Sequence, residues 1–186
     1  EYEVERLDAA RAVLLVVDLQ DRLVPVMRET KTLVRRCARL IEGCRALNVP
    51  VLATEQYPKG LGRMVRDIDK ALDDAPIHEK TRFSACVQPV SREIERLGRD
   101  QVIIAGIEAH VCVLQTCLDL REKGKAVFLP WDATSSRRAI DRDAALRRLA
   151  GEGVLPTTVE GALFEMVREA STDAFAAVRD VIKPSD

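Results

Sequence analysis

Apolar runs alternate with helix-like spacing along most of this 186-residue chain. Uninterrupted apolar runs are typical of strands that are covered on both faces, whereas apolar residues three and four positions apart indicate amphipathic helices. The pattern predicts six strands, at residues 12–19, 49–54, 77–80, 101–105, 125–130 and 154–157. It predicts helices at residues 30–47, 87–97, 111–123, 139–150, 161–168 and 172–182, and a short helix or turn at 64–72.

This alternation predicts an α/β fold in which parallel strands are joined by right-handed helical crossovers. We expect a single domain over residues 1–186, a three-layer α/β/α sandwich around a six-stranded parallel sheet with strand order 3-2-1-4-5-6. Sheets of this kind bind ligands beyond the carboxyl ends of their strands, at the point where the strand order reverses. In this order, that point lies between the first and fourth strands.

Reactive side chains stand at that edge of the predicted sheet. Asp18 closes the first apolar run, and Cys112 follows the fourth strand at the start of a predicted helix. Lys80 closes the third strand, so its segment must reach back across the crevice. A helix start and a nearby ammonium both favour a thiolate, which is the nucleophilic form of cysteine. The pattern therefore predicts a cysteine hydrolase.

Composition excludes several other classes of function. Hydrophobic residues make up 47% and charged residues 32% of the chain, and the net charge is −1, with basic and acidic residues interleaved. We therefore expect neither a nucleic acid nor a membrane as partner, and no apolar run is long enough to cross a bilayer. The five cysteines form no Cys-x-x-Cys pair. With no disulfide or signal-peptide pattern, a reducing, cytoplasmic location is expected.

Several stretches together resemble a known superfamily. Residues 18–20, 79–84 and 106–112 are similar to the isochorismatase-like cysteine hydrolases, a superfamily that includes nicotinamidases, carbamoyl-sarcosine amidohydrolases and isochorismatases. Residues 54–62 and 132–137 look closest to the branch called isochorismatase domain-containing proteins. The resemblance covers nearly the whole chain. It implies the same sandwich fold and, for members with the full set of catalytic residues, hydrolysis of amide or ureido C–N bonds.

The resemblance also implies a role for individual residues. Cys112 would be the nucleophile, Asp18 the proton shuttle and Lys80 the cation that holds both. A cis peptide bond would join Ile107 to Glu108, and the N–H groups of Glu108 and Cys112 would form an oxyanion hole. The residues expected to contact substrate are Gln20, Tyr57, Phe83, Ile107 and His110.

The chain departs from the superfamily pattern at two kinds of position. Nicotinamidases bind a divalent metal through an Asp and a His after the second strand, where this chain has Gln56 and Pro58. We therefore predict no metal and no cofactor, which argues against nicotinamide as the substrate. True isochorismatases lack the cysteine, so Cys112 argues against isochorismate. Because members are commonly oligomers, we expect a homo-oligomer that acts on a small-molecule substrate.

Each residue alone also has a plainer interpretation. Asp18 could be a turn or cap residue, Lys80 a surface charge and Cys112 a core thiol. His110 fits a structural role as well as a substrate contact, and Trp131 fits the core or a subunit contact better than a pocket wall. The alternative function is an oligomeric partner-binding module with little hydrolysis. A nuclease is disfavoured because the chain has no basic stripe and no metal ligands.

Overall fold

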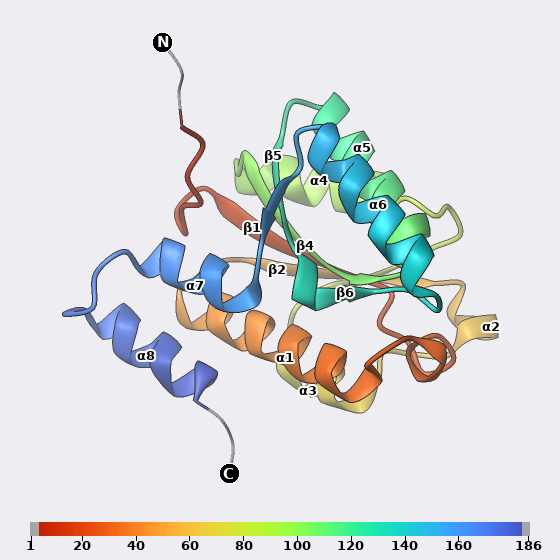
Figure 1. Cartoon of the computed structure of the whole chain (residues 1–186), viewed down its shortest axis with the longest axis horizontal. Coiled ribbons are helices and arrows are strands. Elements are labelled where there is room, and N and C mark those ends of the chain that lie inside the picture. The colour runs from red at the N-terminus through yellow and green to blue at the C-terminus, as the bar shows by residue number, and fades with distance from the viewer. Residues whose placement is uncertain (1–3, 184–186) are drawn as a thin grey trace.

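A parallel sheet lies between two layers of helices in the computed structural model, which describes residues 4–183 (Figure 1). Six strands follow the order β3-β2-β1-β4-β5-β7, and β6 pairs with β4 beside that path. The strands are β1 (Ala12–Val17), β2 (Val51–Gln56), β3 (Ile77–Lys80), β4 (Gln101–Ile107), β5 (Ala126–Pro130), β6 (Thr134–Ser135) and β7 (Leu155–Thr157). The order predicted from the sequence is confirmed, with β7 as its sixth strand.

The structure adds one strand, shifts another along the chain and lengthens a third. β6 has only two residues, too few to produce a hydrophobic pattern, so the sequence did not predict it. β2 continues to Gln56 and β4 continues to Ile107, two residues beyond the predicted ends. These extensions bring both residues to the carboxyl edge of the sheet. The single domain expected over residues 1–186 stays a prediction, since both chain ends lie outside the described residues.

Helices cover both faces of the sheet. α1, α3, α7 and α8 contribute to the core on one face, and α4, α5 and α6 to the core on the other (Figure 1). Within residues 4–183, none of them is both long and apolar enough to cross a bilayer. The helices are α1 (Thr30–Ala46), α2 (Pro58–Leu61), α3 (Arg66–Leu72), α4 (Gln88–Leu97), α5 (Leu114–Glu122), α6 (Ala139–Gly151), α7 (Val159–Val167) and α8 (Asp173–Ile182).

The two central strands, β1 and β4, are buried along their whole length. Alternate residues of β1 face opposite helix layers: Leu14 and Val16 pack in the α1 core, and Val13 and Leu15 in the α5 core. Full burial of one such side chain contributes about 1.5–3 kcal/mol to stability. This packing from both sides fixes the strand ends, and the two segments that carry Asp18 and Cys112 follow directly from those ends.

Gly106 allows the central strands to approach closely near their carboxyl ends. It pairs with Val17 and has a φ of +123°, a conformation that residues with a Cβ rarely adopt. A Cβ at this position would lie 2.0 Å from the carbonyl oxygen of Val17. A side chain here would therefore push directly on the residue that precedes Asp18.

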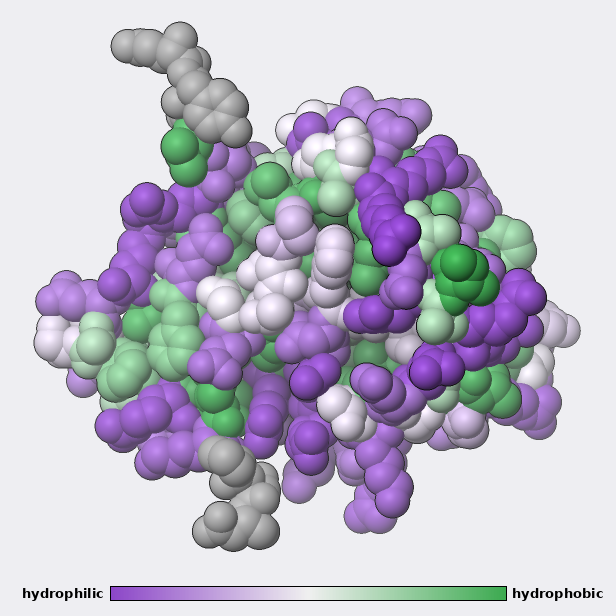
Figure 2. Space-filling view, viewed as in Figure 1, coloured by the Kyte–Doolittle hydropathy of each residue, from purple (hydrophilic) through white to green (hydrophobic). Residues whose placement is uncertain are grey.

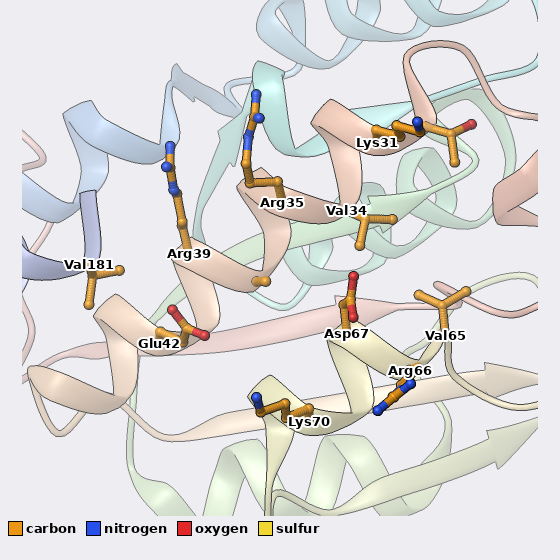
Figure 3. Close-up of a pocket in the computed structure, with 12 residues that line it drawn as sticks. Lys31, Val34, Arg35, Arg39, Glu42, Val65, Arg66, Asp67, Lys70 and Val181 are labelled. Carbon is orange, nitrogen blue, oxygen red and sulfur yellow. The ribbon is translucent and has the colours of Figure 1, made fainter. Parts of the chain in front are cut away.

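The outer surface carries a hollow that lies away from the predicted catalytic residues. The face in Figure 2 is mostly hydrophilic, with its apolar residues in small separate groups. A hollow of about 640 Å³ lies between α1 and α3. Asp67 points toward α1 there, whereas Arg35 and Arg39 point away from α3 (Figure 3). No residue predicted to be catalytic lines this hollow.

Candidate active site

Asp18 lies directly after β1 and is fully buried. Its backbone has a positive φ of 54°, which aspartate tolerates better than most residues. The hydroxyl of Thr54, on the neighbouring strand β2, donates to Asp18 Oδ1 at 2.8 Å. The ammonium of Lys80 donates to Asp18 Oδ2 at 2.7 Å. Both carboxylate oxygens are therefore held by side chains from neighbouring strand ends.

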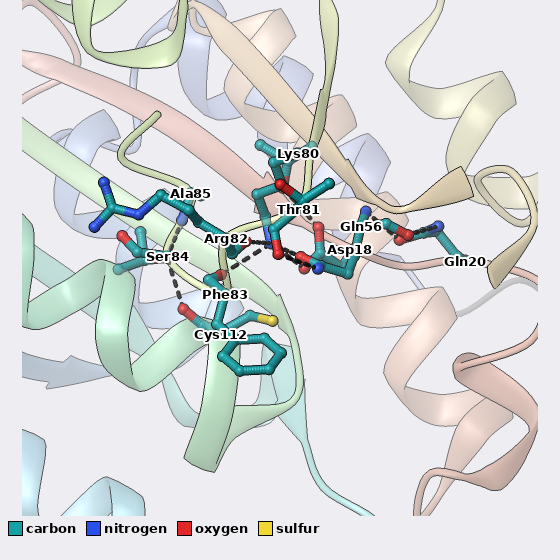
Figure 4. A network of polar contacts seen from close by, with 12 residues as sticks. Asp18, Gln20, Gln56, Lys80, Thr81, Arg82, Phe83, Ser84, Ala85 and Cys112 are labelled. Atoms are coloured by element: carbon teal, nitrogen blue, oxygen red, sulfur yellow. Dashed lines mark hydrogen bonds and ion pairs between the residues drawn. The ribbon is translucent and has the colours of Figure 1, made fainter. Parts of the chain in front are cut away.

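Lys80 ends β3, and its side chain reaches past the end of β2 to contact Asp18 (Figure 4). On the way, Nζ donates to Gln56 Oε1 at 2.6 Å. It also contacts the carbonyl oxygens of Arg82 at 3.1 Å and Phe83 at 2.9 Å. Four acceptors surround a group that has three N–H donors, so the ammonium is fully satisfied. Lys80 thus reaches back from the third strand to Asp18, as the predicted strand order required.

Cys112 completes the group from the other central strand. It lies in a one-turn π-helix, Ala109–Val113, that follows β4 and continues into α5. The residue is 7% exposed, and its sulfur points toward the Lys80–Asp18 pair (Figure 4). Both charges act on the thiol, since Asp18 raises its pKa and Lys80 lowers it. The structure thus brings Asp18, Lys80 and Cys112 together at one edge of the sheet.

The thiol of Cys112 is not acidified, contrary to the expectation from the sequence. Burial, followed by the charge of Asp18, raises its pKa from 9.0 to about 12 and outweighs the opposing effect of Lys80. Burial disfavours the charged form of any thiol, and this effect exceeds that of one nearby cation. Burial likewise raises the pKa of the Asp18 carboxyl, although Lys80 opposes that shift. At neutral pH, Cys112 therefore rests as a neutral thiol.

The peptide bond between Ile107 and Glu108 is cis, as the resemblance implied. Within residues 4–183, no acceptor is found for the N–H of Glu108. The carboxylate of Glu108 accepts from the guanidinium of Arg137 at 3.1 Å and from its backbone N–H at 3.2 Å. The Glu108 N–H is thus a free donor at the start of the helix that carries Cys112, and free N–H groups at helix starts favour negative charge.

Three of the residues expected to contact substrate lie near the surface. Tyr57 and Phe83 are 55% and 53% exposed and belong to segments that contact Lys80 through the backbone. Tyr57 also lines a hollow of about 460 Å³ whose wall includes Lys80. His110 is half-buried, and its Nδ1 lies 2.9 Å from the hydroxyl of Ser136. Tyr57, Phe83 and His110 are therefore accessible enough to contact a substrate, and that role stays a prediction for all three.

Gln20 and Ile107, the other two residues expected to contact substrate, are fully buried. The Gln20 amide donates to the carbonyl oxygens of Gln56 at 2.9 Å and Gly62 at 2.7 Å, and its oxygen accepts from the Gln56 N–H at 2.7 Å. Ile107 packs in the α1 core. Both side chains are thus engaged within the protein, and a substrate contact by either one stays a prediction. Gln20 holds the end of β2 in place.

Two further residues of the site were not predicted from the sequence. Thr54 and Gln56 are polar residues on β2, and their side chains contact Asp18 and Lys80. The only signal in the sequence was that the apolar run of this strand ends in polar residues. Gln56 also donates to the carbonyl oxygen of Thr81 at 2.8 Å. Its amide is therefore committed to the loop that surrounds the Lys80 ammonium.

Comparison with known proteins decides the family. The isochorismatase domain matches residues 12–161. The chain belongs to the isochorismatase family. Its relatives include isochorismatase domain-containing protein 2 of Danio rerio, which is 38% identical over 180 residues that cover 96% of this chain and 90% of the relative. This isochorismatase-family protein is thus a member of a hydrolase superfamily.

Solved structures show the same fold. The MAR1 ribonuclease of Caenorhabditis elegans superposes with a TM-score of 0.92 at 36% identity, over 96% of this chain and 92% of that one. The YcaC protein of Escherichia coli, described as an octameric hydrolase of unknown specificity, superposes with a TM-score of 0.91 at 26% identity, over 97% and 91% of the two chains. The fold of this isochorismatase-family protein is therefore shared with hydrolases along nearly its whole length.

Proposed function

We propose that this isochorismatase-family protein is a metal-independent cysteine hydrolase that cleaves a C–N bond of a small amide, carbamoyl or ureido compound. The observation that carries the proposal is the position of the Cys112 sulfur, which points toward the buried Asp18–Lys80 pair (Figure 4). Burial keeps this thiol neutral. A neutral thiol is a weak nucleophile and needs a base in reach at the moment of attack. A carboxylate with a raised pKa is a better base than an ordinary aspartate.

In the first half of the reaction, Cys112 Sγ attacks the carbonyl carbon while its proton passes to Asp18. The resulting oxyanion accepts hydrogen bonds from the N–H groups of Glu108 and Cys112. Loss of one such donor typically costs about 10²–10³ in rate. When the tetrahedral intermediate collapses, the C–N bond breaks, Asp18 returns the proton to the leaving nitrogen, and a thioester remains on Cys112.

In the second half, a water molecule attacks the thioester carbon. Asp18 removes a proton from the water, and the C–S bond breaks as that proton returns to the sulfur. The products are an acid and ammonia or an amine, and the enzyme regains its neutral thiol. Throughout, Lys80 holds the Asp18 carboxylate and balances its charge.

The proposal of a metal-independent reaction rests on the contacts of Gln56. Its amide oxygen accepts from the Lys80 ammonium at 2.6 Å and its amide nitrogen donates to the Thr81 carbonyl, so the side chain is engaged in the protein itself. Pro58, the other residue at a position that matches a metal ligand, begins the short helix α2. A proline side chain has no donor atom for a metal.

Assembly and location complete the proposal. The octameric YcaC protein of Escherichia coli supports a homo-oligomer, because the two proteins superpose over nearly their whole lengths. All five cysteines of this chain are free thiols, which fits the reducing cytoplasm.

Two other functions are tested beside this one. One is a partner-binding module with little hydrolysis, and the other is cleavage of RNA, which the name of the Caenorhabditis elegans relative suggests.

The test is release of ammonia or amine from a library of small amides, carbamoyl and ureido compounds, with an RNA oligonucleotide as a further substrate. The variants are Cys112→Ala and, as a matched control, Cys117→Ala, since Cys117 is a fully buried thiol on α5. We expect the wild type and Cys117→Ala to release the product, also in the presence of EDTA, and Cys112→Ala to release none.

Three results would contradict the proposal. Full activity of Cys112→Ala would exclude the cysteine mechanism. RNA cleavage without any C–N hydrolysis would assign the protein to the ribonucleases. A folded protein that turns over none of the compounds would favour the binding module.

A further inference from the structure

Thr116 makes two hydrogen bonds that join separate parts of the site. The residue is fully buried on α5, one helical turn after Cys112. Its hydroxyl donates to the carbonyl oxygen of Cys112 at 2.6 Å and accepts from the N–H of Ala85 at 2.8 Å. The first bond is ordinary for a threonine inside a helix. The second reaches the loop between β3 and α4, which is remote in sequence.

That loop surrounds the ammonium of Lys80. The carbonyl oxygens of Arg82 and Phe83 contact Lys80 Nζ at 3.1 and 2.9 Å, and Ala85 follows two residues later (Figure 4). A single hydroxyl, that of Thr116, therefore connects the segment that carries the nucleophile with the segment that holds the cation. A shift of the loop relative to α5 would move Lys80, and with it Asp18, relative to the sulfur.

A second contact ties the same loop to the same helix. The hydroxyl of Ser84 donates to Asp119 Oδ2 at 2.6 Å and accepts from the N–H of Cys86 at 3.1 Å. Asp119 lies three residues after Thr116, and residues at this spacing share one face of a helix. Thr116 and Asp119 thus both hold the loop on α5, and of these two Thr116 is the one that also contacts Cys112.

We propose that Thr116 is a positioning residue that sets the distance between the Cys112 thiol and the Asp18–Lys80 pair. This role rests on the proposed function, because it matters only if the pair takes the thiol proton. Removal of the hydroxyl leaves the N–H of Ala85 without its partner in the interior, which favours movement of the loop. A displacement of about 1 Å in a reacting group can cost about 10²-fold in rate.

The experiment measures alkylation of Cys112 by iodoacetamide as a function of pH, with peptide mapping to separate Cys112 from the other thiols. It compares the wild type with Thr116→Val, which has nearly the same shape but no hydroxyl, and with Thr116→Ser, which keeps the hydroxyl. Thr172→Val is the control. The Thr172 hydroxyl also donates to a carbonyl oxygen, that of Glu169, and accepts from an N–H, that of Phe175, but it caps the N-terminus of α8, away from the site. Circular dichroism establishes that each variant is folded.

We expect Thr116→Val to alkylate roughly 10²-fold more slowly at pH 7. In the wild type, a carboxylate base should give an alkylation rate that is level over a range of pH. Thr116→Val should lose this plateau and should react only as the thiolate forms at high pH. Thr116→Ser and Thr172→Val should follow the wild type. If Thr116→Val does not fold, Thr116→Ala, which also removes the hydroxyl, must show the same slowing.

Two results would overturn the positioning role. A folded Thr116→Val, or in its place Thr116→Ala, with the rate and pH profile of the wild type would refute the role of Thr116 and leave the proposed hydrolase intact. A wild-type protein that itself reacts only as the thiolate would refute base catalysis by Asp18, and the positioning role would fall with it.

Discussion

Lys80 and Asp18 form an ion pair in the interior, with 2.7 Å between Lys80 Nζ and Asp18 Oδ2 and neither side chain exposed. Burial of two charges is costly, and the cost is recovered only with close geometry and further hydrogen bonds. Thr54 and Gln56 provide those bonds from β2, one to each member of the pair. Neighbouring side chains therefore support the ion pair on both sides, and its contribution to the free energy of unfolding can be measured.

Loss of one partner should destabilise the fold strongly. Lys80→Met leaves the buried Asp18 carboxylate without its cation, and we expect the free energy of unfolding to fall by about 3–5 kcal/mol. The double variant Asp18→Asn/Lys80→Met should recover part of that loss, because no buried charge remains. Urea denaturation followed by circular dichroism measures both. Removal of the exposed ion pair of Arg96 and Glu93 on α4 is the control and should change little.

The pH dependence of the reaction should report Asp18 rather than the thiol. The carboxyl must be ionised to accept the proton, and burial raises its pKa, so the rate should rise with pH through a midpoint above the ordinary range of aspartate. The thiol has a pKa of about 12, so the rate should then stay level through pH 9. Initial rates between pH 4 and 10 test this, with Asp18→Asn as the variant that loses the rising limb. A tenfold rise per pH unit from pH 8 to 10 would show instead that the free thiolate attacks.

Gly106→Ala should damage the fold and the site together. The new Cβ would lie 2.0 Å from the Val17 oxygen, at a φ of +123°. Backbone strain and overpacking of about 1–3 kcal/mol each should lower the free energy of unfolding by about 3 kcal/mol or more. Gly98→Ala is the matched control, because Gly98 also has a positive φ, +64°, but has no atom within 4 Å of the added Cβ. Urea denaturation should show a clearly smaller loss for Gly98→Ala, and equal losses would contradict the predicted clash.

The sheet could be predicted from the sequence because its strands leave a clear signal. β1 and β4 are buried on both faces, so both appear as continuous apolar runs, and the alternation with helices fixes their parallel order. β6 could not be predicted, because two residues carry no periodicity. The meeting of Asp18 with Cys112 followed from the strand order alone, since both lie at the carboxyl ends of adjacent strands.

Side-chain environments at the site could not be predicted in the same way. Gln20 and Ile107 are neighbours of the site in sequence, but the direction of each side chain depends on the local turn, and both point into the interior. The pKa of Cys112 depends on how completely three separate segments cover the sulfur, and the sequence shows only the nearby charge of Lys80. The contact of Gln56 with Lys80 depends on the continuation of β2 two residues past its predicted end.

The most direct measurement of the central claim is the mass of the protein during turnover. An amide or carbamoyl compound that the wild type hydrolyses is mixed with the enzyme, quenched in acid, and the protein is digested and mapped by mass spectrometry. We predict an acyl adduct on the peptide that contains Cys112, removed by hydroxylamine as a thioester is, and absent from Cys112→Ala. An adduct on a different residue, or Cys112→Ala releasing product at the wild-type rate, would contradict the account.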